Sequence, residues 1–191
     1  MRADKAIDFW EKGFPFSHFF GVIMELYFYY IKSDYIEYLK NCELSVRGYT
    51  CVPNMHYAST DKFTFGAVLN IRGINYFVPI SSYSKKQQDN ILMKDKTNKI
   101  LGSLRFQYMI PVPKECTVKV DIKNLPTEYN RVHTSKELAF CRRNREKIFR
   151  KADKTYNRVI NSCNNELVKN SCDFKLLERA YVDYCKTNGI D

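Results

Sequence analysis

The feature that most constrains the fold is a long apolar stretch that a single glycine divides in two. Phe63 to Arg72 (FTFGAVLNIR) and Ile74 to Ile80 (INYFVPI) flank Gly73, and both runs are rich in β-branched and aromatic residues. Two such runs joined at a turn residue predict a β-hairpin. Because apolar residues stand at nearly every position, the hairpin should be buried. The chain is therefore built around a sheet.

The rest of the pattern places strands first and helices after them. The predicted strands cover residues 26–32, 63–72, 74–80, 100–110 and 116–122. The predicted helices cover residues 34–41, 124–163 and 173–186, where apolar residues recur with a period of 3.6. Hairpins without βαβ units predict an α+β fold, in which an antiparallel sheet is backed by C-terminal helices.

The N-terminal part has the apolar content of a membrane span or a signal peptide. Residues 14–31 read FPFSHFFGVIMELYFYYI, but a proline, a histidine and a glutamate interrupt them, and no small-residue cleavage site follows. We therefore expect neither a span nor a signal. Met24 stands just before the first predicted strand, so residues 1–23 are expected to be an extension upstream of the usual start. Residues 24–191 have the length of a single domain.

The charge of the chain indicates a polyanionic partner. The formal net charge is +10, which points to nucleic acid or to an anionic membrane surface. Aromatic residues make up 15% of the chain and favour nucleic acid, because their rings stack on unpaired bases. Partners of this kind bind through phosphates that Lys and Arg neutralise.

Most of this charge falls in one predicted helix. Residues 131–158 hold ten Lys and Arg against three acids, which leaves +7 (10 − 3). If the helix is unbroken, five of these cations share one face; they are Arg143, Lys147, Arg150, Lys154 and Arg158. An exposed helix face without a partner would usually carry both positive and negative side chains. A run of like charges instead raises the free energy of the folded state through repulsion, and a bound anion would offset that repulsion. The pattern favours phosphate binding.

The cysteines indicate a reducing compartment and no metal. Seven cysteines are scattered along the chain without a CxxC pair or a paired Cys/His cluster. An odd, scattered set is typical of reduced thiols in a cytoplasmic protein. A tetrahedral zinc site usually includes a closely spaced ligand pair, so we expect neither a metal nor another cofactor.

Several segments, taken in order, resemble a known family. They are YYIKSDYIEYLK (Tyr29–Lys40), KFTFGAVLNIRGINYFVPISS (Lys62–Ser82), LGSLRFQYMIPV (Leu101–Val112), ELAFCRRNREKI (Glu137–Ile148) and CDFKLLERAYVDY (Cys172–Tyr184). Together they are similar to the toxins of type III toxin–antitoxin systems, the ToxN/AbiQ/CptN group. The resemblance covers residues 24–186, and it depends on the whole series of segments.

The resemblance implies a fold, an activity and a partner. It implies a compact, highly curved antiparallel sheet, distantly similar to MazF/Kid-type toxins. It implies a metal-independent, sequence-specific endoribonuclease that cuts single-stranded, adenine-rich RNA and leaves a 2′,3′-cyclic phosphate. The expected inhibitor is a cognate antitoxin RNA of pseudoknot repeats, which the toxin processes and binds in a cyclic toxin–RNA assembly. Cellular or phage mRNA is the expected substrate, and abortive infection in phage defence is the expected role.

The resemblance also assigns site residues. Lys62 matches the family's active-site lysine, and Ser82 with Ser81 matches its Thr/Ser-Ser pair. Tyr57 matches a loop tyrosine with an offset of one residue. Either Lys85 or Lys86 matches the lysine after the serines; we assign Lys85 to the catalytic set and Lys86 to RNA binding. The other predicted RNA-binding residues are Tyr35, His56, Arg131, Arg142, Arg143, Lys147, Arg150, Lys154 and Arg158.

These residue types suit cleavage by the 2′-hydroxyl of the RNA itself. Such a reaction needs alignment of the 2′-oxygen, neutralisation of the phosphorane and transfer of two protons. Lys62 can neutralise charge, and the serine hydroxyls can donate to phosphate oxygens. The sequence leaves the general base open: His56 stays a candidate, whereas His133 stands where the family pattern has no histidine and is interpreted as structural or RNA-contacting.

Two other functions share parts of this pattern. A noncatalytic RNA-binding module would have the same charge and aromatic content, but it would not cut RNA. A peripheral membrane protein could use the aromatic N-terminal stretch and the basic charge. A Ser/His/Asp hydrolase is unsupported, because no G-x-S-x-G motif is present.

Overall fold

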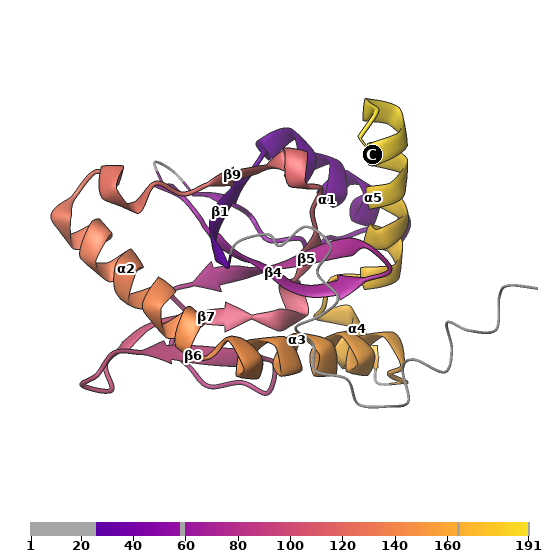
Figure 1. Ribbon diagram of the computed structural model, residues 1–191. Helices are drawn as coiled ribbons and strands as arrows, with labels where there is room; N and C mark the ends of the chain where they lie inside the picture. Colours follow the sequence, from indigo (N-terminus) through magenta and orange to yellow (C-terminus); the bar gives the residue numbers. More distant parts are fainter. Residues whose placement is uncertain (1–25, 58–59, 164, 191) are drawn as a thin grey trace, which may run out of the picture.

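The computed structural model describes residues 26–57, 60–163 and 165–190, and these form a sheet flanked by helices (Figure 1). The strands are β1 (Tyr27–Ile31), β2 (His56–Tyr57), β3 (Thr60–Asp61), β4 (Thr64–Ile71), β5 (Ile74–Ser81), β6 (Asn90–Lys94), β7 (Ile100–Arg105), β8 (Ile110–Pro111) and β9 (Thr117–Lys119). The α-helices are α1 (Ser33–Arg47), α2 (Glu128–Arg143), α3 (Arg145–Ile160), α4 (Asn165–Lys169) and α5 (Phe174–Asn188). Short 3-10 turns include η2 (Phe106–Tyr108).

The main sheet is antiparallel and has seven strands in the order β6-β7-β5-β4-β1-β9, with β8 paired to β5. The predicted hairpin is its centre: β4 pairs with β5 from Thr64 opposite Pro79 to Ile71 opposite Ile74. Gly66 lies against the ring of Phe77, and a Cβ atom there would overlap that ring. A side chain at position 66 would therefore force the hairpin apart.

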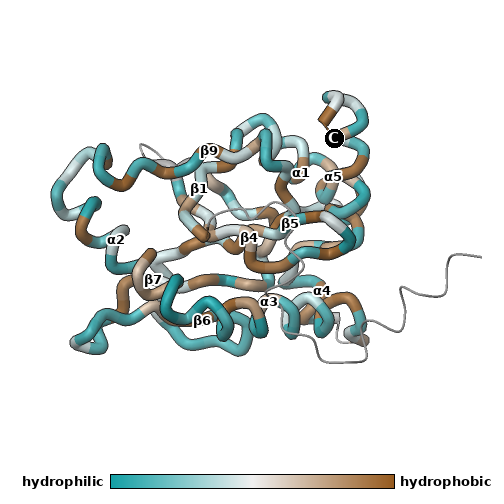
Figure 2. The backbone as a smooth tube through the Cα atoms, viewed as in Figure 1, coloured by the Kyte–Doolittle hydropathy of each residue, from teal (hydrophilic) through white to brown (hydrophobic). Residues whose placement is uncertain are grey.

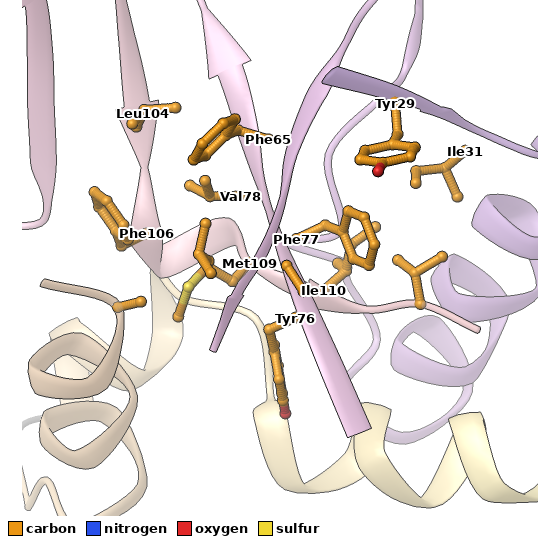
Figure 3. Packing of buried hydrophobic residues seen from close by; sticks show 14 of the residues in the cluster. Tyr29, Ile31, Phe65, Tyr76, Phe77, Val78, Leu104, Phe106, Met109 and Ile110 are labelled. Carbon is orange, nitrogen blue, oxygen red and sulfur yellow. The ribbon is translucent and has the colours of Figure 1, made fainter. Parts of the chain in front are cut away.

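The core includes side chains from both faces of this hairpin and from the strands and helices packed around it (Figure 3). Phe65 and Phe77 are fully buried, and Phe77 packs edge-on against Tyr29 with ring centroids 5.6 Å apart. Figure 2 shows hydrophobic stretches on the central strands and also on the helices, where they alternate with hydrophilic ones. Burial of the hairpin, which its near-continuous apolar run predicted, is confirmed.

Two of the C-terminal helices, α3 and α5, pack against different parts of the sheet. Near the C-terminus, α5 packs against α1 and β8, and α3 packs against β4 and η2 (Figure 1). The hydroxyls of Tyr76 on β5 and Tyr156 on α3 both donate to Glu178 on α5, at 3.0 and 2.5 Å. These bonds tie two helices to the sheet. The α+β class with C-terminal helices is therefore confirmed, with an open sheet.

Several boundaries differ from the predictions. The helix predicted over residues 124–163 breaks at Asn144, whose N–H bonds to the carbonyls of Phe140 and Cys141 and closes α2 before α3 begins. Strand β6 was not predicted. The strand expected over residues 100–110 ends at Arg105 and continues as η2 and β8. Within the described residues, no helix is long and apolar enough to span a membrane.

Candidate active site

The β4–β5 hairpin brings the two main predicted catalytic groups to one end of the sheet. The N–H of Ile80 on β5 donates to the carbonyl of Phe63 at 3.1 Å, so the pairing of the two strands continues to the residue just before β4. Lys62 precedes β4, and Ser81 and Ser82 end or follow β5. Cross-strand neighbours in an antiparallel pair lie close together. Lys62 and the serines are therefore neighbours in space although 20 positions separate Lys62 from Ser82.

A cavity of about 230 Å³ opens at this end of the hairpin. Its walls come from the hairpin, from β7 and from α2, and they consist of Lys62, Phe63, Ile80, Ser81, Ser82, Leu101, His133 and Glu137. Whole-ligand pockets usually measure about 300–1,000 Å³, so this cavity suits one reacting group better than a whole nucleotide. It combines a cation, two hydroxyls, an imidazole and a carboxyl group.

Glu137 is the buried acid of the cavity. Its side chain is 6% exposed, and burial raises the pKa of its carboxyl group to about 8, because the ionised form loses hydration. The carboxyl therefore carries its proton at neutral pH. Glu137 can lie this close to β7 because position 102 is glycine. A Cβ atom at Gly102 would lie 2.8 Å from Oε1 of Glu137 and 3.0 Å from the carbonyl oxygen of Ser81.

His133 connects Glu137 to the surface. Its Nε2 atom lies 3.5 Å from Oε1 of Glu137, and its side chain is 29% exposed. On the solvent side, the ring of Tyr129 stacks on the imidazole with centroids 5.5 Å apart and an interplanar angle of 20°. Tyr129 is 71% exposed. The three residues are four positions apart, so one face of α2 leads from solvent into the cavity.

The sequence interpretation did not assign either α2 residue to the site. The sequence pattern favours a structural or RNA-contacting role for His133 and presents Glu137 only as one of three acids among the cations. One signal was present: Glu137 stands beside Leu138 and four residues before Cys141, in a stripe that the helical period predicts to be buried. An acid at such a position needs a partner or carries a proton.

The loop after Ser82 holds the two other predicted lysines. The N–H of Tyr83 donates to Oγ of Ser81 at 3.2 Å, which turns the chain into the loop 82–89. Lys85 is exposed, and Lys86 donates to the carbonyl oxygen of Asn90 at 2.7 Å. Neither lysine is among the described residues that line the cavity. Burial, and then the charges of Lys151 and Lys147, lower the pKa of Lys86.

The predicted cationic face is divided by the break at Asn144. Arg143 ends α2, whereas Lys147, Arg150 and Lys154 are exposed on α3. Arg158 instead forms an ion pair with Asp89, whose side chain is 8% exposed. The expectation of five cations along one unbroken helix is therefore wrong, and Arg158 serves the fold.

Three other predicted RNA contacts have structural partners. Tyr35 is fully buried and donates to the carbonyl of Pro111 at 2.8 Å, so the expectation that it contacts RNA is wrong. Arg131 donates to the carbonyl of Leu125 at 2.7 Å and is half-buried. Arg142 is exposed and lies over the ring of Tyr27, 5.2 Å from its centroid.

The side chains of Tyr57 and His56 lie outside the described part of the structure. The backbone of both residues forms β2, which pairs with β3. The N–H of Lys62 donates to the carbonyl of Met55 at 2.8 Å, which holds the start of this small hairpin beside the cavity. Across the described ranges, no group of three His, Cys, Asp or Glu side chains is arranged to hold a metal ion.

The sequence and the fold match known proteins over most of the chain. Residues 27–182 match the family "Toxin ToxN, type III toxin-antitoxin system". The chain is 34% identical over 173 residues to endoribonuclease ToxN of Pectobacterium atrosepticum, covering 83% of this chain and 94% of the relative. It is 28% identical over 176 residues to endoribonuclease AbiQ of Lactococcus lactis subsp. lactis, covering 85% and 91%.

Two solved structures share the fold. One comes from work on selective inhibition of a type III toxin by a non-coding RNA pseudoknot; it superposes with a TM-score of 0.73 at 26% identity and covers 82% of this chain and 96% of that one. The other is AbiQ, a lactococcal anti-phage endoribonuclease, with a TM-score of 0.70 at 27% identity, covering 84% and 98%. The resemblance stated from the sequence segments is thereby confirmed. The chain belongs to the ToxN toxin family of type III toxin–antitoxin systems, a family of endoribonucleases.

Proposed function

We propose that the protein is a toxin that cuts single-stranded, adenine-rich RNA without a metal, by attack of the 2′-hydroxyl on the adjacent phosphate, to leave a 2′,3′-cyclic phosphate. The observation that carries this proposal is the cavity that Lys62, Ser82, His133 and Glu137 share. These groups supply a positive charge, a hydrogen-bond donor and a proton-carrying pair. A transesterification of RNA requires all three.

Lys62 and Ser82 stabilise the phosphate in this proposal. As the 2′-oxygen attacks, the phosphorus gains a fifth ligand and its oxygens gain negative charge. The ammonium group of Lys62 attracts this charge more strongly in a partly dry cavity than in water. The hydroxyl of Ser82, which is exposed at the cavity, donates to a non-bridging oxygen. Ser81 also lines the cavity, and its Oγ accepts from the N–H of Tyr83.

The pair of His133 and Glu137 handles the proton of the 2′-hydroxyl. His133 is the more exposed of the two, and imidazole is the side chain that most often acts as a general base. In the proposed step the bond between the 2′-oxygen and phosphorus forms, the bond to the 5′-oxygen breaks, and the 2′ proton moves to His133. The leaving 5′-oxygen takes a proton from solvent. Glu137, 3.5 Å behind the imidazole, orients the ring.

The proteins that share this fold also indicate a partner and a role for this toxin. One structural neighbour concerns a toxin inhibited by an RNA pseudoknot, and another concerns a processed non-coding RNA that regulates an antiviral system. We infer that a pseudoknot-repeat RNA inhibits this toxin, is processed by it and joins it in a cyclic assembly. The toxin then acts in the cytoplasm on cellular or phage mRNA and stops phage growth by abortive infection.

One experiment tests the chemistry and separates an enzyme from a noncatalytic RNA-binding module. The purified protein is incubated with total RNA in excess EDTA, and the new 3′ ends are mapped with and without a phosphatase that opens cyclic phosphates. The proposal predicts fragments with cyclic phosphate ends, enriched at adenines. Bound but intact RNA would identify a noncatalytic module, and loss of cleavage in EDTA would contradict the metal-independent mechanism.

A further inference from the structure

A second cavity, of about 650 Å³, lies at the far end of the loop 82–89. The loop contributes Gln87 and Asp89, the end of β7 and η2 contribute Arg105 and Tyr108, and α3 contributes Arg158. The volume is within the usual range of ligand pockets, about 300–1,000 Å³. This cavity shares no lining residue with the one that contains Lys62 and Ser82.

The guanidinium group of Arg105 lines this cavity and lies over two aromatic rings. It lies 4.4 Å from the ring centroid of Tyr108 and 5.0 Å from that of Tyr83. Its Nη2 atom donates to Oε1 of Gln87 at 3.4 Å and to the hydroxyl of Tyr108 at 3.3 Å, which are long hydrogen bonds. Cation–π contacts therefore fix the plane of the group while its other N–H donors stay available. Tyrosine rings and arginine planes are surfaces on which unpaired bases stack.

The polar groups around Arg105 suit the edge of a base. Gln87 uses its carbonyl oxygen on Arg105, which leaves its amide N–H groups to donate. Gln107, which also lines the cavity, donates its amide N–H to the carbonyl of Asn170 at 2.7 Å. The Nε atom of Arg158 is buried and has no hydrogen-bond partner within the described residues. Planar amides and guanidinium groups are the side chains that read base edges.

Three lysines lie close together beside the loop 82–89, which reaches from the first cavity to the second. Lys86 donates to the carbonyl of Asn90, and Lys151 on α3 donates to the carbonyl of Gln88 at 2.7 Å. Lys147 stands one turn before Lys151, and both are close enough to Lys86 to repel its charge. The mutual repulsion of these three lysines costs free energy, and the phosphates of a bound RNA backbone would offset that cost. The loop that carries Lys86 begins at Ser82, in the first cavity.

We propose that the second cavity binds an unpaired base of the RNA, several nucleotides from the phosphate that is cut. The base stacks against Arg105 and Tyr108, and the intervening phosphates pass Lys86, Lys147 and Lys151. This inference rests on the proposed function, because it assumes that the cut strand is RNA. Under this proposal Arg105 is a positioning residue. It strengthens RNA binding and fixes which phosphate enters the first cavity, but it does not touch the reacting atoms.

The test uses full-length protein that carries Ser82→Ala, which keeps the RNA intact, and a single-stranded RNA of about a dozen nucleotides, enough to span more than one binding subsite. 2-Aminopurine replaces one base at a time. We expect one position away from the cut to change fluorescence on binding. Adding Arg105→Ala should abolish that change and weaken binding about tenfold, in line with the loss of one stacked base. Arg105→Lys should fail equally, because it keeps the charge but loses the plane.

The control is Arg179→Ala, which removes an equal charge from an exposed position on α5. In protein with an intact Ser82, Arg105→Ala should raise the KM for the long RNA about tenfold more than the KM for a dinucleotide, because a dinucleotide is too short to occupy both cavities. Equal effects on both substrates, binding as tight as in the Arg179→Ala control, or displacement of the signal by free AMP alone would overturn the proposal. If RNA binds with this Arg105 dependence but the wild-type protein never cuts it, the proposed function fails and the subsite stands.

Discussion

Nε2 of His133 lies 3.5 Å from Oε1 of Glu137, one helical turn away on α2, inside the cavity that also contains Lys62 and Ser82. This contact joins a half-exposed imidazole to a buried carboxyl group. It places a proton-carrying pair opposite the hairpin end from which the lysine and the serine come. Four chemically different groups thus converge from the ends of β4 and β5 and from α2.

The burial of Glu137 makes the stability of the fold depend on pH. The pKa of its carboxyl group is raised from 4.5 to about 8, so the folded state keeps a proton that the unfolded chain has lost. This contribution is complete below about pH 4.5 and disappears as the pH rises through 8. Between these values stability should fall by up to about 1.4 kcal/mol per pH unit. Urea unfolding at several pH values measures this slope.

Glu137→Gln provides the control, because the amide copies the protonated acid and does not titrate. The variant should be nearly as stable as the wild type at pH 5 and should lose the slope above it. Both proteins are best compared in a His133→Gln background, which removes the contact between the imidazole and residue 137 from both. Identical slopes with glutamate and glutamine would refute the assignment of a raised pKa.

Gly102→Ala should disturb the carboxyl group of Glu137. The added methyl group would lie 2.8 Å from Oε1 of Glu137 and 3.0 Å from the backbone of Ser81. Overpacking of this kind costs about 1–3 kcal/mol of unfolding free energy. In a double-mutant cycle, prior Glu137→Ala should reduce that cost, since the atom nearest to the added methyl group is then absent. Strict additivity of the two substitutions would show that Glu137 does not pack there.

Arg158 and Arg150 on α3 should respond differently to alanine. Arg158→Ala leaves Asp89 buried without its cation and should cost about 3–5 kcal/mol in urea unfolding. Arg150 is 84% exposed, and its Nη2 atom comes no closer than 4.0 Å to Oε2 of Glu146, which makes a weak ion pair. Its loss should therefore change the free energy of unfolding by less than about 0.5 kcal/mol. Similar losses for the two variants would contradict a structural role that is specific to Arg158.

Replacing the exposed cations of α3 should change the salt dependence of RNA binding. Lys147 and Lys154 are exposed on this helix, and contacts to phosphate are independent of base sequence. Each alanine substitution should reduce the slope of log affinity against log salt by about one and weaken all RNA sequences alike. An unchanged slope in fluorescence-anisotropy titrations would exclude that lysine from the phosphate path.

The sequence predicted the parts of this structure that depend on local pattern. Phe63 to Ile80 has an apolar run and one turn glycine, which are enough to specify a hairpin, and the ends of that hairpin necessarily bring Lys62 near Ser82. The break at Asn144 was not predictable from period alone, because the stripes of α2 and α3 continue each other in sequence. The burial of Tyr35 and the pairing of Arg158 depend on tertiary neighbours.

The α2 contribution to the cavity shows the same limit. The sequence does not show which strands α2 packs against, and the structure shows that it packs on β6 and β7. The helical period predicts that Glu137 is buried, but only the packing of α2 shows that it lies beside the serines. The sequence resemblance assigned the lysine and the serines, and packing added the pair that can carry a proton.

The most direct test of the account is the rate of RNA cleavage in EDTA by wild-type protein, Lys62→Ala, Ser82→Ala and the double variant, all checked for native circular dichroism. Each single substitution should lower the rate by about a hundredfold or more, and the double variant should lose little beyond the worse single one, because both groups act on one phosphate. Lys123→Ala and Ser135→Ala, at exposed positions outside the cavity, are the matched controls. A folded Lys62→Ala or Ser82→Ala protein that cuts RNA at the wild-type rate would contradict the account.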